Sequence, residues 1–360
     1  MTILVDLSIL RHPYCGLGQV ALGYGHWYAT APDAIADGTE VTLLVPKSYV
    51  GRFGDRVHYL AARNIYRSCP WLMPRFDVWH SIHQLSPFRP ASAGCRRIVT
   101  IHDVNFIYEK QGAKRRRYLA RLQRECDQAA DLCFISRFAH ADAARHLDLG
   151  SRPVHIIYNG VAPLTEGPQE KPAGVDGGRP YFLSLGVVKA KKNLHTLLPM
   201  MDHLPEHRLV IAGDDSGAYA RSLRQQLSRH PGVSLVGTVS DAGRRWLYAH
   251  CTGLLFPSLA EGFGLPIVEA MQWGKPVFCS RSTSLPEIGG DLARYFDSFE
   301  PQAMADVVRQ GLGSFSAAQA DAERRRAALF SLDRHMRQYR DLYAGSLPAD
   351  GYAFGPASLL

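Results

Sequence analysis

The sequence lacks the cysteine patterns of disulfide-rich and zinc-binding proteins. Its seven cysteines contain no Cys-x-x-Cys pair, and their number is odd. Disulfide frameworks use an even set of cysteines, and zinc sites draw on closely spaced pairs. We therefore expect a protein of a reducing compartment that has neither a disulfide framework nor a zinc site.

Long apolar runs are also missing. No stretch approaches the roughly 18 apolar residues that a membrane-spanning helix needs, and residues 1–6 enter a strand pattern without a preceding basic segment. We expect a cytoplasmic protein, with any membrane contact made peripherally at the inner face of the cytoplasmic membrane. The chain contains no internal repeat, no low-complexity array and no Asp-x-Asp motif for holding a metal ion.

Length and charge set the next limits. The 360 residues are 46% hydrophobic, which is enough for the cores of two domains. Residues 1–160 hold 20 Lys and Arg against 13 Asp and Glu, whereas residues 161–360 hold 21 against 20. The positive excess of the first half can attract nucleic acid, anionic lipid or a phosphorylated substrate. No nucleic-acid motif accompanies it, and we expect no nucleic-acid partner.

Short apolar runs separated by helical patterns form two βα series. The first predicts buried strands at residues 2–7, 41–45, 78–81, 98–101, 132–135 and 155–158, and a helix at 20–28. Residues 163–180 are rich in Pro and Gly, as in a linker. The second series predicts strands at 181–185, 208–212, 233–236, 253–256 and 276–279, followed by a helix-prone tail at 317–343. This alternation predicts an α/β protein with two parallel, Rossmann-like sheets.

A glycine-rich turn and a helix start stand together at residues 261–271, Glu-Gly-Phe-Gly-Leu-Pro-Ile-Val-Glu-Ala-Met. Pro266 suits the first turn of a helix because its missing N–H is not needed there. Gly262 and Gly264 let the backbone approach a ligand closely, and a helix start favours an anion. Two carboxylates, Glu261 and Glu269, can accept hydrogen bonds from sugar hydroxyls beside that anion. The alternative is an ordinary strand-to-helix turn with two surface glutamates.

The whole string resembles the Glu-x7-Glu signature of the retaining glycosyltransferases of family 4. The resemblance implies the GT-B fold, in which two Rossmann-like domains face each other across a cleft. It implies domains at 1–162 for the acceptor and 181–330 for the donor, a linker at 163–180, and a helix at 331–360 that crosses back to the first domain. It also implies that Glu261 touches the donor sugar, that the backbone of residues 262–266, including Phe263 and Leu265, faces sugar and phosphate, and that Glu269 binds the ribose.

Residues 186–194, Gly-Val-Val-Lys-Ala-Lys-Lys-Asn-Leu, join a predicted strand to a helix start. They read either as a solvated basic loop or as a phosphate site. The family's Gly-x4/5-Lys-Asn string resembles this segment and implies that Gly186 and Lys192 contact the donor diphosphate. Many members carry Arg where this chain has Val187, and Lys189 or Lys191 is the candidate replacement.

Three other segments resemble family landmarks. Thr100-Ile101-His102-Asp103 matches the family's Thr-x-His-Asp, which implies that His102 lies against the donor sugar and that Asp103 orients it or the acceptor. An isolated histidine here would more simply bond a backbone carbonyl. Residues 233–241 resemble the strand and turn before the family's base pocket, which implies that backbone groups near Val239 contact the nucleotide base of the donor. The Gly16 to Ala21 segment fits the dinucleotide fingerprint but stands apart from its strand, so the resemblance assigns Gly16 and Gly18 to a loop near the donor phosphates.

The resemblance implies a retaining, metal-independent glycosyltransferase without a cofactor. We expect it to move a sugar, with mannose from GDP-mannose as our choice, from a nucleotide diphosphate sugar to a glycan or lipid-linked acceptor of lipopolysaccharide, capsule or exopolysaccharide. The alternatives are a GT-B nucleotide-sugar epimerase and a non-catalytic glycan-binding subunit. The first half has two basic clusters, each of which is either a solvated face or a contact for an anionic membrane. The first cluster has aromatic residues between its members Arg52, Arg56, Arg63, Arg67 and Arg75. The second consists of Lys114, Arg115, Arg116 and Arg117.

Overall fold

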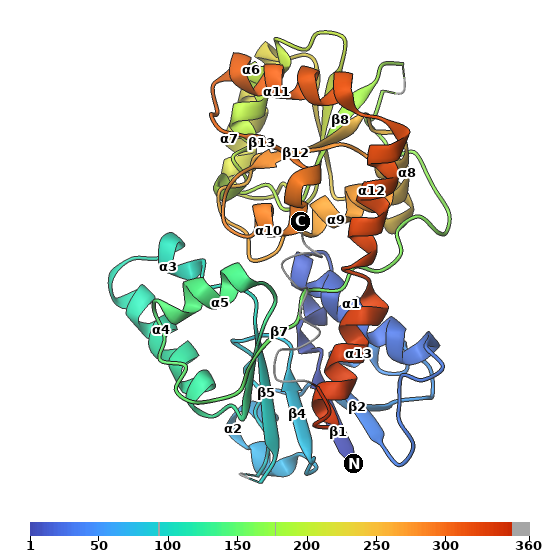
Figure 1. Ribbon diagram of the computed structural model, residues 1–360. Coiled ribbons are helices and arrows are strands. Elements are labelled where there is room, and N and C mark those ends of the chain that lie inside the picture. Colours follow the sequence, from blue (N-terminus) through green and yellow to red (C-terminus); the bar gives the residue numbers. More distant parts are fainter. Residues whose placement is uncertain (93, 177, 348–360) are drawn as a thin grey trace. The chain divides into compact units, whose positions relative to one another are not determined.

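The computed structural model describes residues 1–92, 94–176 and 178–347, which form two compact units (Figure 1). The first unit comprises Met1–Ala162 together with the described residues from Leu332 onward, and the second comprises Pro163–Ser331. Residues 348–360 of the expected C-terminal segment lie outside the described residues.

A parallel sheet of order β3-β2-β1-β4-β5-β6-β7 forms the centre of the first unit as described. Its strands are β1 (Thr2–Asp6), β2 (Glu40–Val45), β3 (His58–Ala61), β4 (Val78–Ser81), β5 (Arg96–Ile101), β6 (Asp131–Phe134) and β7 (Val154–Ile156). Its helices are α1 (Gly16–Thr30), α2 (Ile65–Ser68), α3 (Phe106–Glu109), α4 (Gly112–Asp127), α5 (Arg137–Ala144) and α13 (Leu332–Tyr343), with 3₁₀ turns at Ser8–Arg11, Lys47–Tyr49 and Pro70–Leu72.

A second parallel sheet, of order β10-β9-β8-β11-β12-β13, forms the centre of the second unit as described. Its strands are β8 (Tyr181–Leu185), β9 (Arg208–Ala212), β10 (Val233–Gly237), β11 (Gly253–Phe256), β12 (Val277–Ser280) and β13 (Arg294–Phe296). Its helices are α6 (Leu197–Met201), α7 (Ala218–Gln226), α8 (Asp241–His250), α9 (Leu265–Gln272), α10 (Leu285–Gly289), α11 (Pro301–Ser314) and α12 (Ala317–Ala328), with 3₁₀ turns at Ala190–Lys192, Leu194–Thr196, Leu227–Arg229 and Gly290–Leu292.

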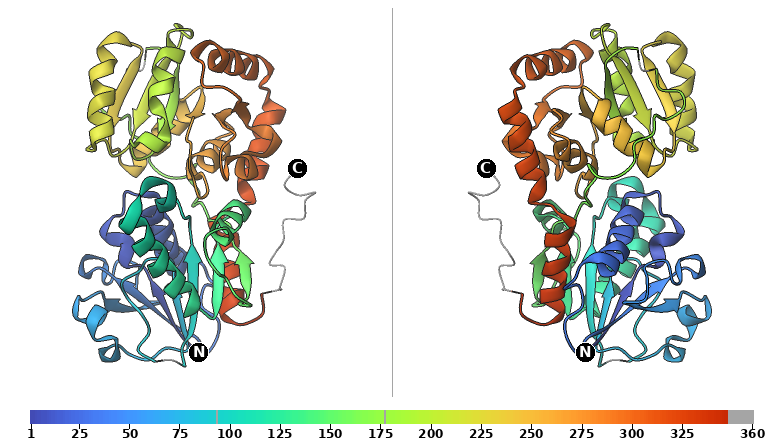
Figure 2. Two further views of the ribbon diagram at one scale, coloured as in Figure 1. Left: turned by 90° about the vertical axis from the view of Figure 1, so that its left-hand side faces the viewer. Right: turned by 90° about the vertical axis from the view of Figure 1, so that its right-hand side faces the viewer.

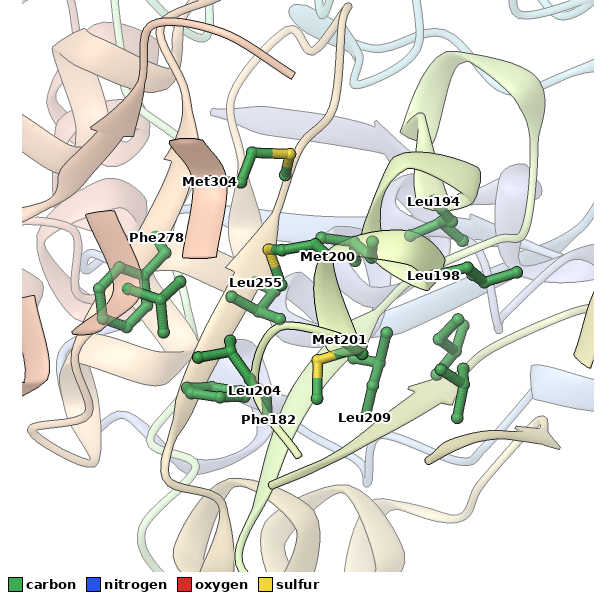
Figure 3. Packing of buried hydrophobic residues seen from close by; sticks show 14 of the residues in the cluster. Phe182, Leu194, Leu198, Met200, Met201, Leu204, Leu209, Leu255, Phe278 and Met304 are labelled. Carbon is green, nitrogen blue, oxygen red and sulfur yellow. The ribbon is translucent and has the colours of Figure 1, made fainter. Parts of the chain in front are cut away.

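The core of the second unit shows why its strands are apolar throughout. Phe182, Leu255 and Phe278 pack with Met200 and Met304 from the covering helices α6 and α11 (Figure 3). Adjacent residues of a strand point to opposite faces of the sheet, and their neighbours Leu183, Leu254 and Val277 are buried on the opposite face as well. Helices therefore cover both faces (Figure 2), as parallel sheets require. The expected α/β class with two parallel sheets is confirmed.

Two edge strands, β3 and β13, were not predicted from the sequence. β3 has no fully buried residue, and β13 is only three residues long with one buried residue. Neither shows the apolar run that marks a central strand, because an edge strand is covered less completely. The tail predicted at 317–343 is helical, but it breaks between Ala328 and Leu332 into α12 and α13.

Helix α13 is fastened to the first unit by buried hydrogen bonds. His80 bonds the Tyr343 hydroxyl through Nδ1 at 2.6 Å and Thr100 Oγ1 through Nε2 at 2.8 Å. His335 donates from Nδ1 to the Tyr158 carbonyl oxygen at 2.7 Å and bonds the Tyr24 hydroxyl through Nε2 at 3.0 Å. Donation from Nδ1 leaves Nε2 of a neutral His335 ring as the acceptor for the Tyr24 hydroxyl. Burial lowers the pKa of His335 to about 4.

We predict that the free energy of unfolding falls as the pH drops from about 6.5 to about 4. A histidine whose folded pKa is depressed gains protons mainly in the unfolded state over this window, so acid favours unfolding. In urea titrations across these pH values, His335→Gln should show a smaller fall than the unaltered chain. His58→Gln, at an exposed position, is the control and should leave the fall unchanged. An equal fall in all three proteins would contradict the prediction.

Candidate functional site

The predicted residues of the second unit gather where its strand order reverses. The chain runs from β8 outward through β9 to β10, then returns to β11 on the other side of β8. The loop after β8 and the loop after β11 therefore lead to helices on opposite sides of the sheet. Such loops leave a crevice at the carboxyl edge of the sheet, where α/β proteins bind ligands. Gly186 follows β8, and Glu261 lies in the loop after β11, so both belong to this switch point.

Lys192 is the cation at this point. Its Nζ lies 2.5 Å from Glu261 Oε1 and 4.9 Å from the centroid of the Phe256 ring. A Cβ atom on Gly186 would lie 3.6 Å from the same Nζ, so the ammonium group sits directly beside the glycine backbone. Its side chain is only 15% exposed. A largely desolvated ammonium at the carboxyl edge is suited to binding a phosphate oxygen.

Backbone contacts join the Lys192 turn to the loop after β11. The carbonyl oxygen of Lys191 accepts hydrogen bonds from Leu259 N at 2.8 Å and from Ser258 Oγ at 3.2 Å. Lys191 thus contributes its main chain to the site. Lys189 is exposed, whereas Val187 and Lys191 are half-buried.

Glu261 is held in one orientation by its neighbours. Its Oε1 accepts a hydrogen bond from Ser258 Oγ at 2.6 Å in addition to the Lys192 contact. Its N–H donates to Thr283 Oγ1 at 3.1 Å, and Ser284 Oγ donates to the carbonyl oxygens of Glu261 and Phe263 at 3.1 and 2.9 Å. Sequence reasoning missed these hydroxyl residues, although a Ser/Thr run after a predicted strand was the available signal.

The glycine turn continues into α9 as predicted. Gly264 is the N-cap at φ +111°, and a Cβ atom there would approach Leu285 Cδ2 to 2.9 Å, so both conformation and space require glycine. Pro266 lies in the first turn. The Phe263 side chain is buried against Phe330, with ring centroids 5.6 Å apart. Gly262 is buried and Leu265 half-buried. Any ligand contact by Phe263 therefore comes from its backbone.

Glu269 is buried in α9 and bonded to two side chains of α8. Tyr248 Oη donates to its Oε2 at 2.8 Å, and Arg244 Nη1 lies 3.4 Å from its Oε1. Val239 lies just before α8, whose N-cap Ser240 accepts a hydrogen bond from Gly243 N at 3.0 Å. The Val239 loop and Glu269 are thus joined through one helix. Tyr248 and Arg244 carry no signal that sequence reasoning used.

His102 and Asp103 follow β5 in the first unit. His102 Nε2 donates to the Ile82 carbonyl oxygen at 2.8 Å, which is the backbone contact named as the simpler alternative. Burial lowers the pKa of His102 to about 4, so the ring is neutral near pH 7 and Nδ1 is its acceptor nitrogen. Gln84 binds the His102 N–H at 3.2 Å and the Asp103 carbonyl at 2.9 Å, while Asp103 Oδ1 accepts from Asn105 N.

The loop expected around Gly16 and Gly18 is instead the first turn of α1, and that expectation was wrong. Cys15 is the N-cap, and its Sγ accepts a hydrogen bond from Gly18 N at 3.3 Å. A Cβ atom on Gly18 would lie 2.3 Å from His12 O. Gly18 is therefore needed for packing against the preceding turn, whereas Gly16 is exposed at the helix start.

The structure thus brings Gly186, Lys192 and Glu261 together in the second unit, with Glu269 on the helix that follows. His102, Asp103, Gly16 and Gly18 belong to the first unit. Within the described ranges, no group of three or more His, Cys, Asp or Glu side chains is arranged to hold a metal ion. Among the helices described, none is both long and apolar enough to cross a membrane.

Two family profiles match the sequence. The profile described as Glycosyltransferase Family 4 matches residues 19–163, and the one described as Glycosyl transferases group 1 matches residues 167–317. The chain is 34% identical over 141 residues to O-antigen chain mannosyltransferase B of Escherichia coli, a match that covers 37% of this chain and 36% of the relative. It is 24% identical over 215 residues to O-antigen chain mannosyltransferase RfbU of Salmonella typhimurium, covering 59% of each. The matched segments thus span from about a third to about three fifths of these relatives.

Solved structures share the fold. Anabaena Alr3699/HepE, solved in complex with UDP-glucose, has a TM-score of 0.76 at 17% identity, with 96% of this chain and 100% of that chain covered. WaaG, a glycosyltransferase involved in lipopolysaccharide biosynthesis, has a TM-score of 0.68 at 15% identity, with the same coverage of each chain.

We predict that pyrophosphate binding depends on Lys192 and is weakened by Glu261. Lys192→Met should reduce the affinity about tenfold or more, since a charge-assisted hydrogen bond is lost. Glu261→Gln should raise the affinity, because the carboxylate no longer competes for the ammonium. Isothermal titration calorimetry with pyrophosphate measures both changes. Lys189→Met removes an equal charge from an exposed position as the control; a loss as large as that of Lys192→Met would contradict the prediction.

Proposed function

Because this chain belongs to the family 4 glycosyltransferases and has their GT-B fold, we propose that it transfers a sugar from a nucleotide diphosphate sugar to a hydroxyl of a glycan or lipid-linked acceptor in surface-polysaccharide synthesis. The contact between Lys192 and Glu261 at the switch point of the second sheet carries the proposal. One group supplies positive charge for a diphosphate, and the other supplies an acceptor for sugar hydroxyls.

We propose that the anomeric configuration is retained and that no metal ion takes part. The bond between the sugar's C1 and the phosphate oxygen breaks, and a bond from C1 to the acceptor oxygen forms on the same face. The acceptor's proton passes to the departing phosphate oxygen, which Lys192 stabilises as charge develops. A double displacement would need a free carboxylate beside C1, and Glu261 is engaged by Lys192 and Ser258.

Three residues of the first unit complete the proposal. His102, neutral and fixed by the Ile82 carbonyl oxygen, offers Nδ1 to a hydroxyl of the donor sugar. Asp103 closes the turn behind it through Asn105 N, so its role is to orient His102 or the acceptor. Gly16, at the exposed start of α1, faces the donor phosphates in this scheme through its backbone N–H.

The donor we propose is GDP-mannose, and the site of action is the cytoplasm at the inner face of the membrane. Two relatives are named as O-antigen mannosyltransferases, which supports mannose and an acceptor of the lipopolysaccharide type. Backbone contacts near Val239 would read the donor's base in this scheme.

The experiment incubates the purified chain with GDP-mannose, UDP-glucose or other nucleotide diphosphate sugars, with and without candidate acceptors, and identifies the products. Transfer to an acceptor supports the proposal. Conversion of the donor sugar without an acceptor would identify an epimerase, and a chain that neither transfers nor hydrolyses any donor would be a binding subunit.

His102→Ala should lower kcat by about tenfold to a hundredfold, on the scale of one or two hydrogen bonds to the reacting sugar. Because its pKa is about 4, His102 stays neutral from pH 5 to 8 and should add no inflection near pH 6.5 to the profile of kcat/KM. Steady-state assays over this range check both statements. A His102→Ala protein with nearly full turnover would contradict the assignment.

We also propose contact with an anionic membrane through residues 62–75. From residue 56 to residue 76 the chain has four arginines and no acidic residue. Ile65, Trp71 and Leu72 are exposed in this segment. Exposed tryptophan and leucine beside arginines fit the interface of an anionic bilayer. The cluster at Lys114–Arg117 lies on α4, and its neighbouring aromatic Tyr108 is bonded to Asp142 at 2.6 Å.

We predict that the chain co-sediments with vesicles containing anionic lipid and that Trp71→Ser with Leu72→Ser weakens this binding severalfold. Removing apolar side chains from the contact makes binding to the membrane less favourable, because less apolar surface is buried in the bilayer interface. Replacing Arg115 and Arg116 by Ser is the matched control for the second basic cluster and should have the smaller effect. Sedimentation that is indifferent to anionic lipid content, or a larger loss in the α4 variant, would refute this assignment.

A further inference from the structure

Two residues with a left-handed backbone flank the contact between Lys192 and Glu261. Among the described residues other than glycine, only Asn193 (φ 56°) and Thr283 (φ 55°) have a positive φ. Asn193 directly follows Lys192, and Thr283 Oγ1 accepts the hydrogen bond from Glu261 N at 3.1 Å. Unfavourable backbone conformations that gather at one place point to a function there.

Thr283 is the more unusual of these two residues. Asparagine tolerates the left-handed region, because its short polar side chain bonds locally, whereas a β-branched residue in this region is an outlier. Glycine would adopt the same φ at no steric cost. We therefore look for a contact that the Thr283 side chain makes and that glycine could not make.

That contact is shared with the next residue of the loop after β12. Thr283 Oγ1 holds the N–H of Glu261, and Ser284 Oγ donates to the Glu261 carbonyl oxygen at 3.1 Å. Adjacent side chains of an extended chain point to opposite sides. The left-handed turn at Thr283 breaks this alternation, so that two consecutive hydroxyls contact one residue. Both main-chain polar groups of Glu261 are thus fixed from a neighbouring loop.

The contacts of the Glu261 side chain leave one oxygen for a ligand. Lys192 Nζ and Ser258 Oγ both bond Oε1, at 2.5 and 2.6 Å. No hydrogen bond from the part of the chain that the structure describes reaches Oε2. Because the main chain and Oε1 are both fixed, Oε2 keeps one direction before a ligand binds, and such preorganisation strengthens binding.

We propose that Thr283 is a positioning residue, whose hydroxyl fixes the main chain of Glu261 so that Oε2 accepts a hydrogen bond from a hydroxyl of the donor sugar. This inference rests on the proposed function, because it takes that sugar as the ligand of Glu261. The stiff χ1 of a β-branched side chain holds the Thr283 hydroxyl in place. Sugar binding therefore depends on this hydroxyl, whereas the left-handed conformation of a β-branched residue lowers the stability of the fold.

Three substitutions separate the hydroxyl from the strain. Thr283→Ser keeps the hydroxyl on an unbranched residue, Thr283→Val keeps the branched shape without a hydroxyl, and Thr283→Gly removes both. Isothermal titration calorimetry compares the affinity of each protein for GDP-mannose with that for GDP, and the affinity for UDP-glucose with that for UDP. The ratio of the two affinities within a pair isolates the sugar from any general change in the nucleotide site.

For the nucleotide that binds, Thr283→Val and Thr283→Gly should shift this ratio against the sugar by about fivefold or more, since a hydrogen bond to the sugar is weakened. Thr283→Ser should keep the ratio within about twofold, because it retains the hydroxyl. Melting temperatures should follow a different order. Thr283→Gly should melt about 2 to 4 °C above Thr283→Val, because glycine relieves the left-handed strain and valine does not.

The outcomes separate the two proposals. A ratio that Thr283→Gly and Thr283→Val leave unchanged would overturn the positioning role while leaving the proposed transfer intact. A ratio that follows the order of the melting temperatures, with Thr283→Gly like Thr283→Ser, would also overturn it. If Thr283→Val does not fold, Thr283→Gly against Thr283→Ser carries the comparison. An unaltered chain that binds none of the four probes, and that no nucleotide diphosphate sugar stabilises against heat, would instead overturn the proposed function.

Discussion

The pairing of Lys192 with Glu261 is the interaction on which the account of this protein depends. Two opposite charges lie 2.5 Å apart with side chains no more than 15% exposed. A surface pair of this kind contributes little to stability, and a desolvated one is costly to form. The presence of this pair at a switch point is better explained by a ligand that uses both charges than by a contribution to stability. Because the two groups sit on loops after β8 and β11, the pair exists only when the central strands of the second sheet are correctly assembled.

The same sheet edge supplies the remaining parts of the site. Hydroxyl residues after β12 fix the turn that carries Glu261, and α8 fixes Glu269 in α9. The turn itself depends on Gly264, whose positive φ and close neighbour Leu285 exclude other residues. Loops placed by rigid strands and braced by neighbouring loops hold reacting groups more accurately than a single flexible loop does. The site is thus a property of the whole β8 to β12 region.

Much of this arrangement could be predicted from sequence, for identifiable reasons. Central strands such as β4 and β8 are apolar on both faces and stand out as short runs, whereas β3 and β13 are partly covered edge strands without that signal. Gly264 and Pro266 mark a turn and a helix start by their own conformational limits. The start of α1 was expected too late in the chain, because Gly16 and Gly18 are poor helix formers and read as loop residues, whereas Gly18 packs inside the first turn. Tyr248 and Arg244 could not be found, because their role depends on a contact between two helices.

The central claim is that the switch point of the second sheet binds the diphosphate of an activated sugar. The most direct measurement is a crystal structure of the chain soaked with GDP-mannose or the nucleotide diphosphate that calorimetry shows to bind. The account predicts a phosphate oxygen within hydrogen-bond distance of Lys192 Nζ and ribose hydroxyls at Glu269. Well-ordered nucleotide bound elsewhere, with the contact between Lys192 and Glu261 unchanged, would contradict it.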